Sequence, residues 1–146
     1  MGNNFIPLAL LYLCFHFILL TQNTREYLYI LTICTIGVLV DSLLQYFSFF
    51  SFVAEKHLPY WLIVLWICFS TTLCHSLKFI GSSIWFQIIA GLIAPFSYLA
   101  GNALDAVQFG QSLLLTYFFL ALIWTLLFIL FFSLKLHFVD KEYGYG

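Results

Sequence analysis

Residues 112–134 read SLLLTYFFLALIWTLLFILFFSL, an uninterrupted run without a charged side chain. A helix needs about 20 predominantly apolar residues to cross a bilayer, so this run is long enough for one span. Four further apolar runs fill most of the remaining chain, which has 146 residues in all. The five predicted spans lie at about 5–22, 27–50, 59–79, 84–104 and 112–134.

The composition agrees with a membrane protein. Hydrophobic residues make up 64% of the chain and charged residues 8%, whereas soluble domains average about 25% charged residues. Because backbone polar groups in lipid have to pair within their own segment, we expect helices. The sequence therefore predicts an all-α, polytopic transmembrane bundle of about five spans in a single domain. The first span is marginal, since it reaches full length only by including Thr21 and Gln22.

Charge excludes one class of partner and predicts an orientation. The net charge is −1 and the basic residues are scattered, so the phosphate-neutralising clusters of nucleic-acid-binding proteins are absent from the sequence. Basic residues are enriched in short cytoplasmic loops. With five spans, one side holds Arg25, Lys78, Lys135 and Lys141, and the other holds Lys56. We expect a multi-pass protein of the inner (plasma) membrane, with a cytoplasmic C-terminus and an outside N-terminus.

Small residues in the fourth run predict close helix packing. The small residues recur along one stripe of the helix, and a proline lies in the same stretch. The residues are Ala90, Gly91, Ala94, Pro95, Ser97 and Gly101. Small side chains let helices approach closely, which is a main source of helix association in lipid. Pro95 lacks a backbone donor and should bend the helix. We expect this run to be central in the bundle.

Asp41 is the main polar anomaly inside a span. A central acidic residue costs about 2.5–3.5 kcal/mol on the insertion scale, which the surrounding apolar residues can offset. It should therefore face protein and have a partner. Asp41 and Gln45 share one helix face, and Asn102 and Asp105 end the fourth run on the same predicted side. Asp41 either binds a cation, a proton or a head group, or it ties neighbouring helices together.

A second polar group lies on the predicted cytoplasmic side. The third run ends with Thr71, His75 and Ser76, and His16 in the first run lies at a similar depth. Histidine can carry protons near neutral pH, but it also serves as a packing residue. Two histidines without a third ligand are a weak metal signal, so the sequence predicts no metal and no cofactor.

Four ordered motifs carry a family resemblance. They are GVLVDSLL at 37–44, PYWLIVLW at 59–66, TTLCHSL at 71–77 and APFSYLAG at 94–101. Over roughly residues 5–135 the chain resembles a family of small bacterial inner-membrane proteins, catalogued as domain of unknown function 2878. The resemblance implies characteristic positions at Asp41, His75, Ser76, Pro95, Tyr98 and Gly101.

The chain departs from that family pattern in three ways. Cys74 stands where the family usually has Asn, and Asp105 stands where it usually has Gly. The first run resembles the second span of the family, so the resemblance implies one helix fewer at the N-terminus than in the family pattern. The resemblance also implies an association with lipid-modifying enzymes.

Three functions remain open from the sequence. The first is a structural or accessory membrane protein, with membrane lipids and a second copy or another membrane protein as partners. The second is a small carrier for protons, ions or a lipid-like molecule, using Asp41 and His75. The third is an intramembrane lipid-modifying enzyme working at Thr71 and His75 with His16. The candidate polar site comprises Asp41, Gln45, Thr71, His75, Ser76, Tyr98 and Asn102. Common catalytic motifs are absent, so the sequence favours a protein that is not an enzyme.

Overall fold

The computed structural model describes residues 6–19, 23–52 and 58–139. In chain order the elements are α1 (Ile6–Leu19), α2 (Thr24–Tyr46), β1 (Phe50–Phe52), α3 (Tyr60–Cys74), the 3-10 helix η2 (Lys78–Ser82), α4 (Ile84–Ile93), α5 (Phe96–Ala103), β2 (Val107–Phe109) and α6 (Leu113–Phe138). The predicted all-α helical fold is confirmed.

Local sequence sets where the helices begin and break. Asn23 caps α2, because its side chain accepts the backbone N–H of Arg25 at 3.0 Å. Extended backbone at Pro59 precedes α3, and Ser83 caps α4 by accepting the N–H of Trp85 at 3.3 Å. The sequence predicts a bend at Pro95, and the structure divides the fourth apolar run there into α4 and α5.

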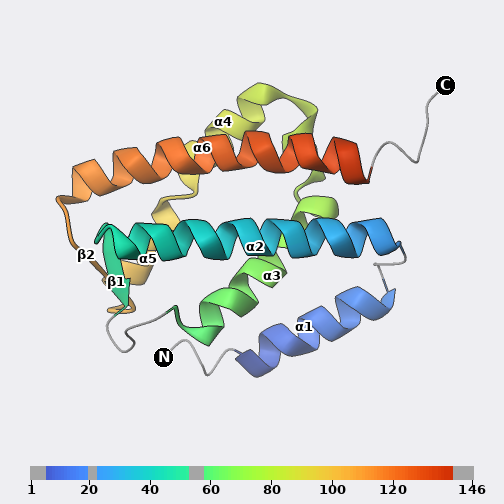
Figure 1. The fold of residues 1–146 in the computed structure, drawn as a ribbon, viewed down its shortest axis with the longest axis horizontal. Coiled ribbons are helices and arrows are strands. Elements are labelled where there is room, and N and C mark those ends of the chain that lie inside the picture. The colour runs from blue at the N-terminus through green and yellow to red at the C-terminus, as the bar shows by residue number, and fades with distance from the viewer. Residues whose placement is uncertain (1–5, 20–22, 53–57, 140–146) are drawn as a thin grey trace.

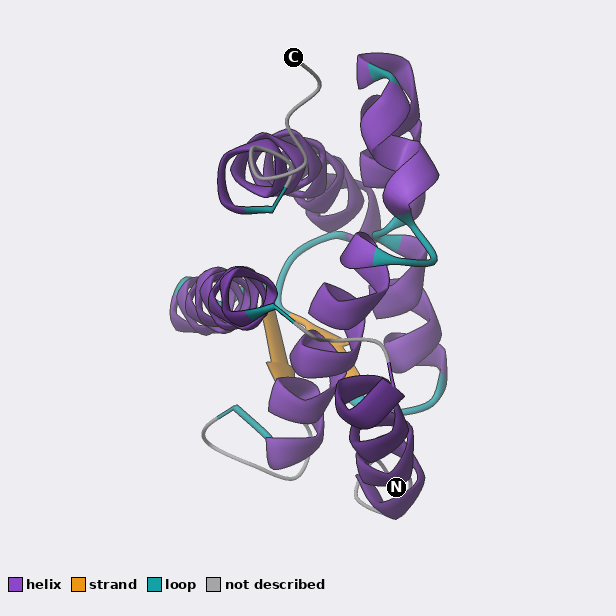
Figure 2. Cartoon of the chain, turned by 90° about the vertical axis from the view of Figure 1, so that its right-hand side faces the viewer, coloured by secondary structure: helices purple, strands orange, loops and turns teal. Residues whose placement is uncertain are grey.

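The helices pack in a simple spatial order. α1 contacts α3, α3 contacts α2, α2 contacts α6, and α6 contacts α4. Figure 1 shows α2 and α6 side by side along the molecule. Figure 2, turned by 90°, shows these two long helices nearly end-on, with the shorter helices along one flank. The prediction that the fourth run is central is therefore wrong: it lies at the edge against α6, and only 17% of its span is buried, against 33% for α2 and for α6.

Aromatic side chains fill the centre where α2, α3 and α6 meet. The rings of Trp66 and Trp124 stack at 5.4 Å, with an interplanar angle of 6°. Tyr29 is fully buried, and its hydroxyl donates to the carbonyl oxygen of Phe131 at 3.0 Å. Gly37 faces the Trp66 ring so closely that an added Cβ would overlap it. The indole therefore needs glycine on α2 in order to fit.

A two-stranded sheet closes one end of the molecule and was not expected. β1 pairs antiparallel with β2, and Phe50, Ser51 and Phe52 lie opposite Phe109, Gln108 and Val107. The sequence predicts that the second helical run reaches residue 50, but α2 ends at Tyr46. Ser48 has a positive φ of 57°, which ends the helical path and turns the chain into β1.

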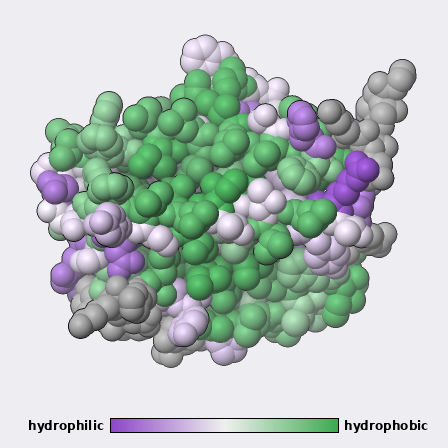
Figure 3. Space-filling model, viewed as in Figure 1, coloured by the Kyte–Doolittle hydropathy of each residue, from purple (hydrophilic) through white to green (hydrophobic). Residues whose placement is uncertain are grey.

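The outer surface is strongly apolar. Figure 3 shows a broad hydrophobic face between polar groups gathered at its two edges. Large side chains stand out from the helices, such as Leu114 at 79% exposed and Ile18 at 77%. A water-soluble monomer rarely exposes so large a continuous apolar area.

Three described segments are long and apolar enough to cross a membrane. They are Thr24–Tyr46, Ile84–Ala103 and Leu113–Phe138, which correspond to the second, fourth and fifth predicted runs. The chain therefore has the helices of a membrane protein. In the first and third runs the helices are shorter, 14 residues in α1 and 15 in α3. The count of about five spans stays a prediction.

Candidate functional site

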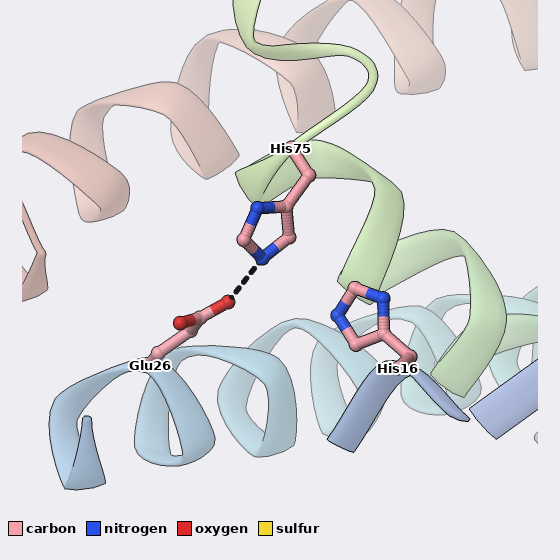
Figure 4. Close-up of side chains that lie close together, drawn as sticks. All are labelled: His16, Glu26 and His75. Atoms are coloured by element: carbon pink, nitrogen blue, oxygen red, sulfur yellow. Dashed lines mark hydrogen bonds and ion pairs between the residues drawn. The ribbon is translucent and has the colours of Figure 1, made fainter. Parts of the chain in front are cut away.

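The ends of three helices bring two histidines and a glutamate together. His16 lies near the C-terminal end of α1, Glu26 lies in the first turn of α2, and His75 is the C-cap residue of α3. Figure 4 shows the three side chains converging from these separate elements. We call these three residues the His–Glu cluster.

The cluster is tight and only partly open to the outside. His75 Nε2 lies 2.7 Å from Glu26 Oε1, and the His16 and His75 ring centroids are 5.0 Å apart. One nitrogen or oxygen from each of the three residues lies within 4.8 Å of the other two. His16 is 3% exposed, whereas the side chain of His75 is 33% exposed. A small ligand could therefore reach the cluster past His75.

Helix-end fields favour an ion pair between His75 and Glu26. A helix N-terminus stabilises a nearby anion and a C-terminus stabilises a cation. Glu26 is in the first turn of α2, and His75 is at the end of α3, so each charge would occupy its favoured place. The pair also ties the end of α3 to the start of α2.

The contact between His75 and Glu26 does not involve the ring nitrogens of His16. Its Nε2 is buried and has no hydrogen-bond partner among the described residues. A buried polar atom without a partner costs on the order of 1–3 kcal/mol, and such atoms are rare. His16 therefore differs from His75 and Glu26, which are joined through Nε2 and Oε1.

Thr71 and Ser76, predicted beside His75, take different positions. Thr71 is fully buried on α3, and its hydroxyl donates to the Cys68 carbonyl oxygen at 2.7 Å. The Tyr12 hydroxyl of α1 lies 3.3 Å from the same Thr71 oxygen, which joins α1 to α3 next to the cluster. Ser76 is exposed and lies outside the cluster.

A shallow hollow lies beside the same end of α3. It is lined by Lys78, Gly81, Phe132, Lys135 and Leu136. Lys135 is 9% exposed, and its ammonium group donates to the carbonyl oxygens of Leu73 and Cys74 at 3.2 and 3.3 Å. A basic group and apolar side chains thus meet next to the peptide that carries His75.

Asp41 lies in a different setting, inside the bundle. It is 1% exposed and accepts two hydrogen bonds, from Trp66 Nε1 and from the Tyr98 hydroxyl, each 2.7 Å long. The bonds join α2 to α3 and to α5. The structure thus brings Asp41 and Tyr98 of the predicted polar site together, with Trp66 as a partner that the sequence did not identify.

The other polar residues predicted near Asp41 do not join it. Asn102 donates its side-chain N–H to the Val107 carbonyl oxygen at 2.8 Å and so holds β2. Asp105 is exposed, with a positive φ of 55°, in the turn after α5. Gln45 is half-buried near the end of α2. None of these three is among the residues to which Asp41 is hydrogen-bonded in the described structure.

The residues of the predicted packing stripe have two different roles. Gly91 is buried against α6, where an added Cβ would overlap the backbone of Thr125. Pro95 is fully buried, and Ala90, Ala94 and Gly101 are partly buried. Ser97 is exposed, and its hydroxyl donates to the Ala94 carbonyl oxygen at 2.7 Å. Close helix contact therefore depends on Gly91, while Ser97 stabilises its own helix near the proline.

Glu26 is the site residue that sequence reasoning missed. It reads as part of the polar break before the second run, with no motif around it. One signal was available: threading the predicted spans up and down places the start of the second run on the side where the third run ends. His75 and Glu26 therefore belong to the same side of the bundle.

Comparison with known proteins gives a family and no activity. The family model described as "Protein of unknown function (DUF2878)" matches residues 2–130. No curated protein and no solved structure matches the chain significantly. The match covers most of the chain and includes Asp41, His75 and Tyr98, so the resemblance drawn from the four sequence motifs is confirmed. The protein belongs to the DUF2878 family.

Proposed function

We propose that the protein is a multi-pass protein of the bacterial inner (plasma) membrane that acts on the head group of a lipid-like molecule at the His–Glu cluster. The observation that carries the proposal is the buried Nε2 of His16, which has no hydrogen-bond partner among the described residues and lies beside His75 and Glu26. Apolar helices supply the membrane setting, and the exposed part of His75 gives access from the bilayer surface.

The position of the His–Glu cluster supports a function at one surface of the membrane. Arg25, Lys78 and Lys135 are predicted on the cytoplasmic side, where basic residues of membrane proteins concentrate. The hollow with Lys78 and Lys135 adjoins the end of α3, so an anionic head group would meet basic groups there and apolar side chains beside them. Membrane lipids are the partners that this chemistry fits.

The setting of Asp41 speaks against the carrier hypothesis. A carrier needs a polar path between the two predicted sites, Asp41 and His75. Asp41 instead accepts bonds at both carboxylate oxygens from Trp66 and Tyr98, in a packed aromatic centre. These bonds describe a structural tie between helices.

The proposal is tested on membrane lipids. Wild type, His75→Ala and His137→Ala are expressed in a bacterial host, and the lipids of the membrane and of the purified protein are compared by mass spectrometry. His137 is an exposed histidine on α6 and provides the matched control. Wild type and His137→Ala should change one lipid class or retain it on purification, and His75→Ala should not. Equal profiles for wild type and empty vector would refute the proposal.

An accessory protein is the second candidate. The tightly packed Asp41–Trp66–Tyr98 group and the broad apolar face fit a helix bundle that binds a second copy or another membrane protein. This reading predicts that variants of the His–Glu cluster assemble and act as wild type does. Crosslinking in membranes, followed by comparison of wild type with His75→Ala, separates it from the first proposal.

A further inference from the structure

We propose that His16, Glu26 and His75 bind one divalent transition-metal ion, with zinc the best fit. The inference names a ligand for the site on which the proposed function rests. Two imidazoles and a carboxylate are a donor set of catalytic zinc sites, which use three protein ligands and keep a fourth position for water or substrate. Calcium and magnesium prefer all-oxygen sites, so two histidines select against them.

The spacing suits a site that is close to its bound form. Zinc–nitrogen distances near 2.0–2.1 Å place tetrahedral ligand atoms about 3.3 Å apart. The three donor atoms lie within 4.8 Å of one another, so a common ion would draw them together by no more than roughly 1.5 Å. The 2.7 Å contact between His75 Nε2 and Glu26 Oε1 is a direct hydrogen bond, and an ion held by both groups would replace it.

His16 gives the independent argument for an ion. The hydrogen bond between His75 and Glu26 explains why these two side chains meet, at the end of α3 and the start of α2. It gives no partner to the buried Nε2 of His16, which lies in the same cluster. A metal ion shared by the three residues satisfies this nitrogen and keeps the carboxylate paired with a positive charge.

The open coordination position links the ion to the proposed lipid chemistry. His75 is the most exposed of the three ligands, so the fourth position would open on its side. A water molecule or an oxygen of a head group could occupy it. The hollow containing Lys78 and Lys135 lies at this end of α3 and would receive the remainder of an anionic head group.

Metal binding is tested on the full chain, purified in detergent without a histidine tag. The protein is stripped with a chelator, reloaded with Zn²⁺ or Co²⁺, and analysed by elemental mass spectrometry and visible absorption. Wild type should bind about one ion per chain and show the absorption bands of four-coordinate cobalt. His16→Ala and His75→Ala should lose at least about 100-fold in affinity, because even the outer-shell partners of metal sites contribute 10–100-fold.

The controls separate the cluster from the other histidines. His137→Ala should bind as wild type does, and Glu26→Gln should bind more weakly with altered cobalt bands. Should the alanine variants fail to fold, pulsed electron paramagnetic resonance of Cu²⁺-loaded wild type decides, because it counts coordinated imidazoles. Two imidazoles per ion support the inference. Fewer than two, or wild-type binding no tighter than that of a folded His16→Ala variant, overturn it.

Failure of this inference is distinguishable from failure of the proposed function. One ion per chain together with an unchanged lipid profile supports the metal site and refutes lipid chemistry. A changed lipid profile that depends on His75, in a protein that binds no ion, refutes the metal site and keeps the proposed function.

Discussion

The two polar groups in the bundle differ in how completely they are satisfied. Asp41 is enclosed, and both of its oxygens accept hydrogen bonds, from Trp66 and Tyr98. The His–Glu cluster lies at helix ends and exposes part of His75, and the part of the chain that the structure describes gives the buried Nε2 of His16 no partner. An ionisable group inside an apolar bundle is therefore not by itself a sign of function. The buried Nε2 of His16, without a partner among the described residues, is the feature that separates the proposed site from the structural group around Asp41.

The largest loss of stability is expected on replacement of Asp41, because both of its carboxylate oxygens accept hydrogen bonds. Asp41→Ala removes the shared acceptor of two donors, and each buried unpaired donor costs about 1–3 kcal/mol, so the free energy of unfolding should fall by roughly 2–6 kcal/mol. Asp41→Asn keeps one acceptor oxygen and should lose less. Unfolding in detergent and the yield of folded protein measure both.

Asp105→Asn is the matched control for Asp41. Asp105 is exposed and has a positive φ, a conformation that asparagine also accepts. Its replacement should leave stability unchanged. Equal stability of Asp41→Ala and Asp105→Asn would contradict the structural role of Asp41.

The second prediction disturbs the same region through packing alone. Gly37→Ala places a methyl group against the Trp66 ring, and overpacking of this kind costs about 1–3 kcal/mol. The indole should shift, and its hydrogen bond to Asp41 should lengthen, which tryptophan fluorescence in detergent can report. Gly101→Ala is the control, because its Cβ would lie 3.3 Å from the nearest Val107 atom and should be better tolerated.

Composition and pattern predicted much of the fold. Helices in the apolar runs and the break at Pro95 follow from backbone pairing in lipid and from the missing proline donor. The β1–β2 sheet could not be predicted from local pattern, because it pairs segments distant in sequence, Phe50–Phe52 and Val107–Phe109. The edge position of the fourth run was also missed, since small residues indicate close contact but not how many neighbours a helix has.

The sequence predicted only those polar residues that lie inside apolar runs. Asp41 and His75 stand out because polar residues inside apolar runs are costly, so the sequence draws attention to each. Glu26 falls in a polar break of the sequence, where a carboxylate draws no attention, and only the structure shows that it is buried beside His75. The hydrogen bond from Trp66 to Asp41 could not be predicted, because it depends on the relative rotation of α2 and α3.

The third prediction concerns the contact between Glu26 and His75, whose loss should reduce stability by a smaller amount. Glu26→Gln weakens a partly exposed pair and removes a carboxylate from the first turn of α2, effects that together amount to about 1–2 kcal/mol. Thermal unfolding in chelator should therefore show a smaller loss than Asp41→Ala gives. If Glu26→Gln destabilises as strongly as Asp41→Ala, the cluster is a structural tie and the contrast between the two regions disappears.

The smallest effect on stability is expected at His16, and it tests the contrast most directly. His16→Leu replaces a buried, unpartnered nitrogen with apolar atoms, so in chelator the variant should be as stable as wild type or more stable by up to about 1 kcal/mol. With Zn²⁺ added, wild type should gain stability in proportion to ion occupancy and the variant should not, because only the wild type would have all three ligands. A marked loss of stability in chelator would mean that His16 serves the fold, as Asp41 does. A His16→Leu variant that is as stable as wild type in chelator, but gains no stability from Zn²⁺, is expected only if the nitrogen of His16 binds a ligand.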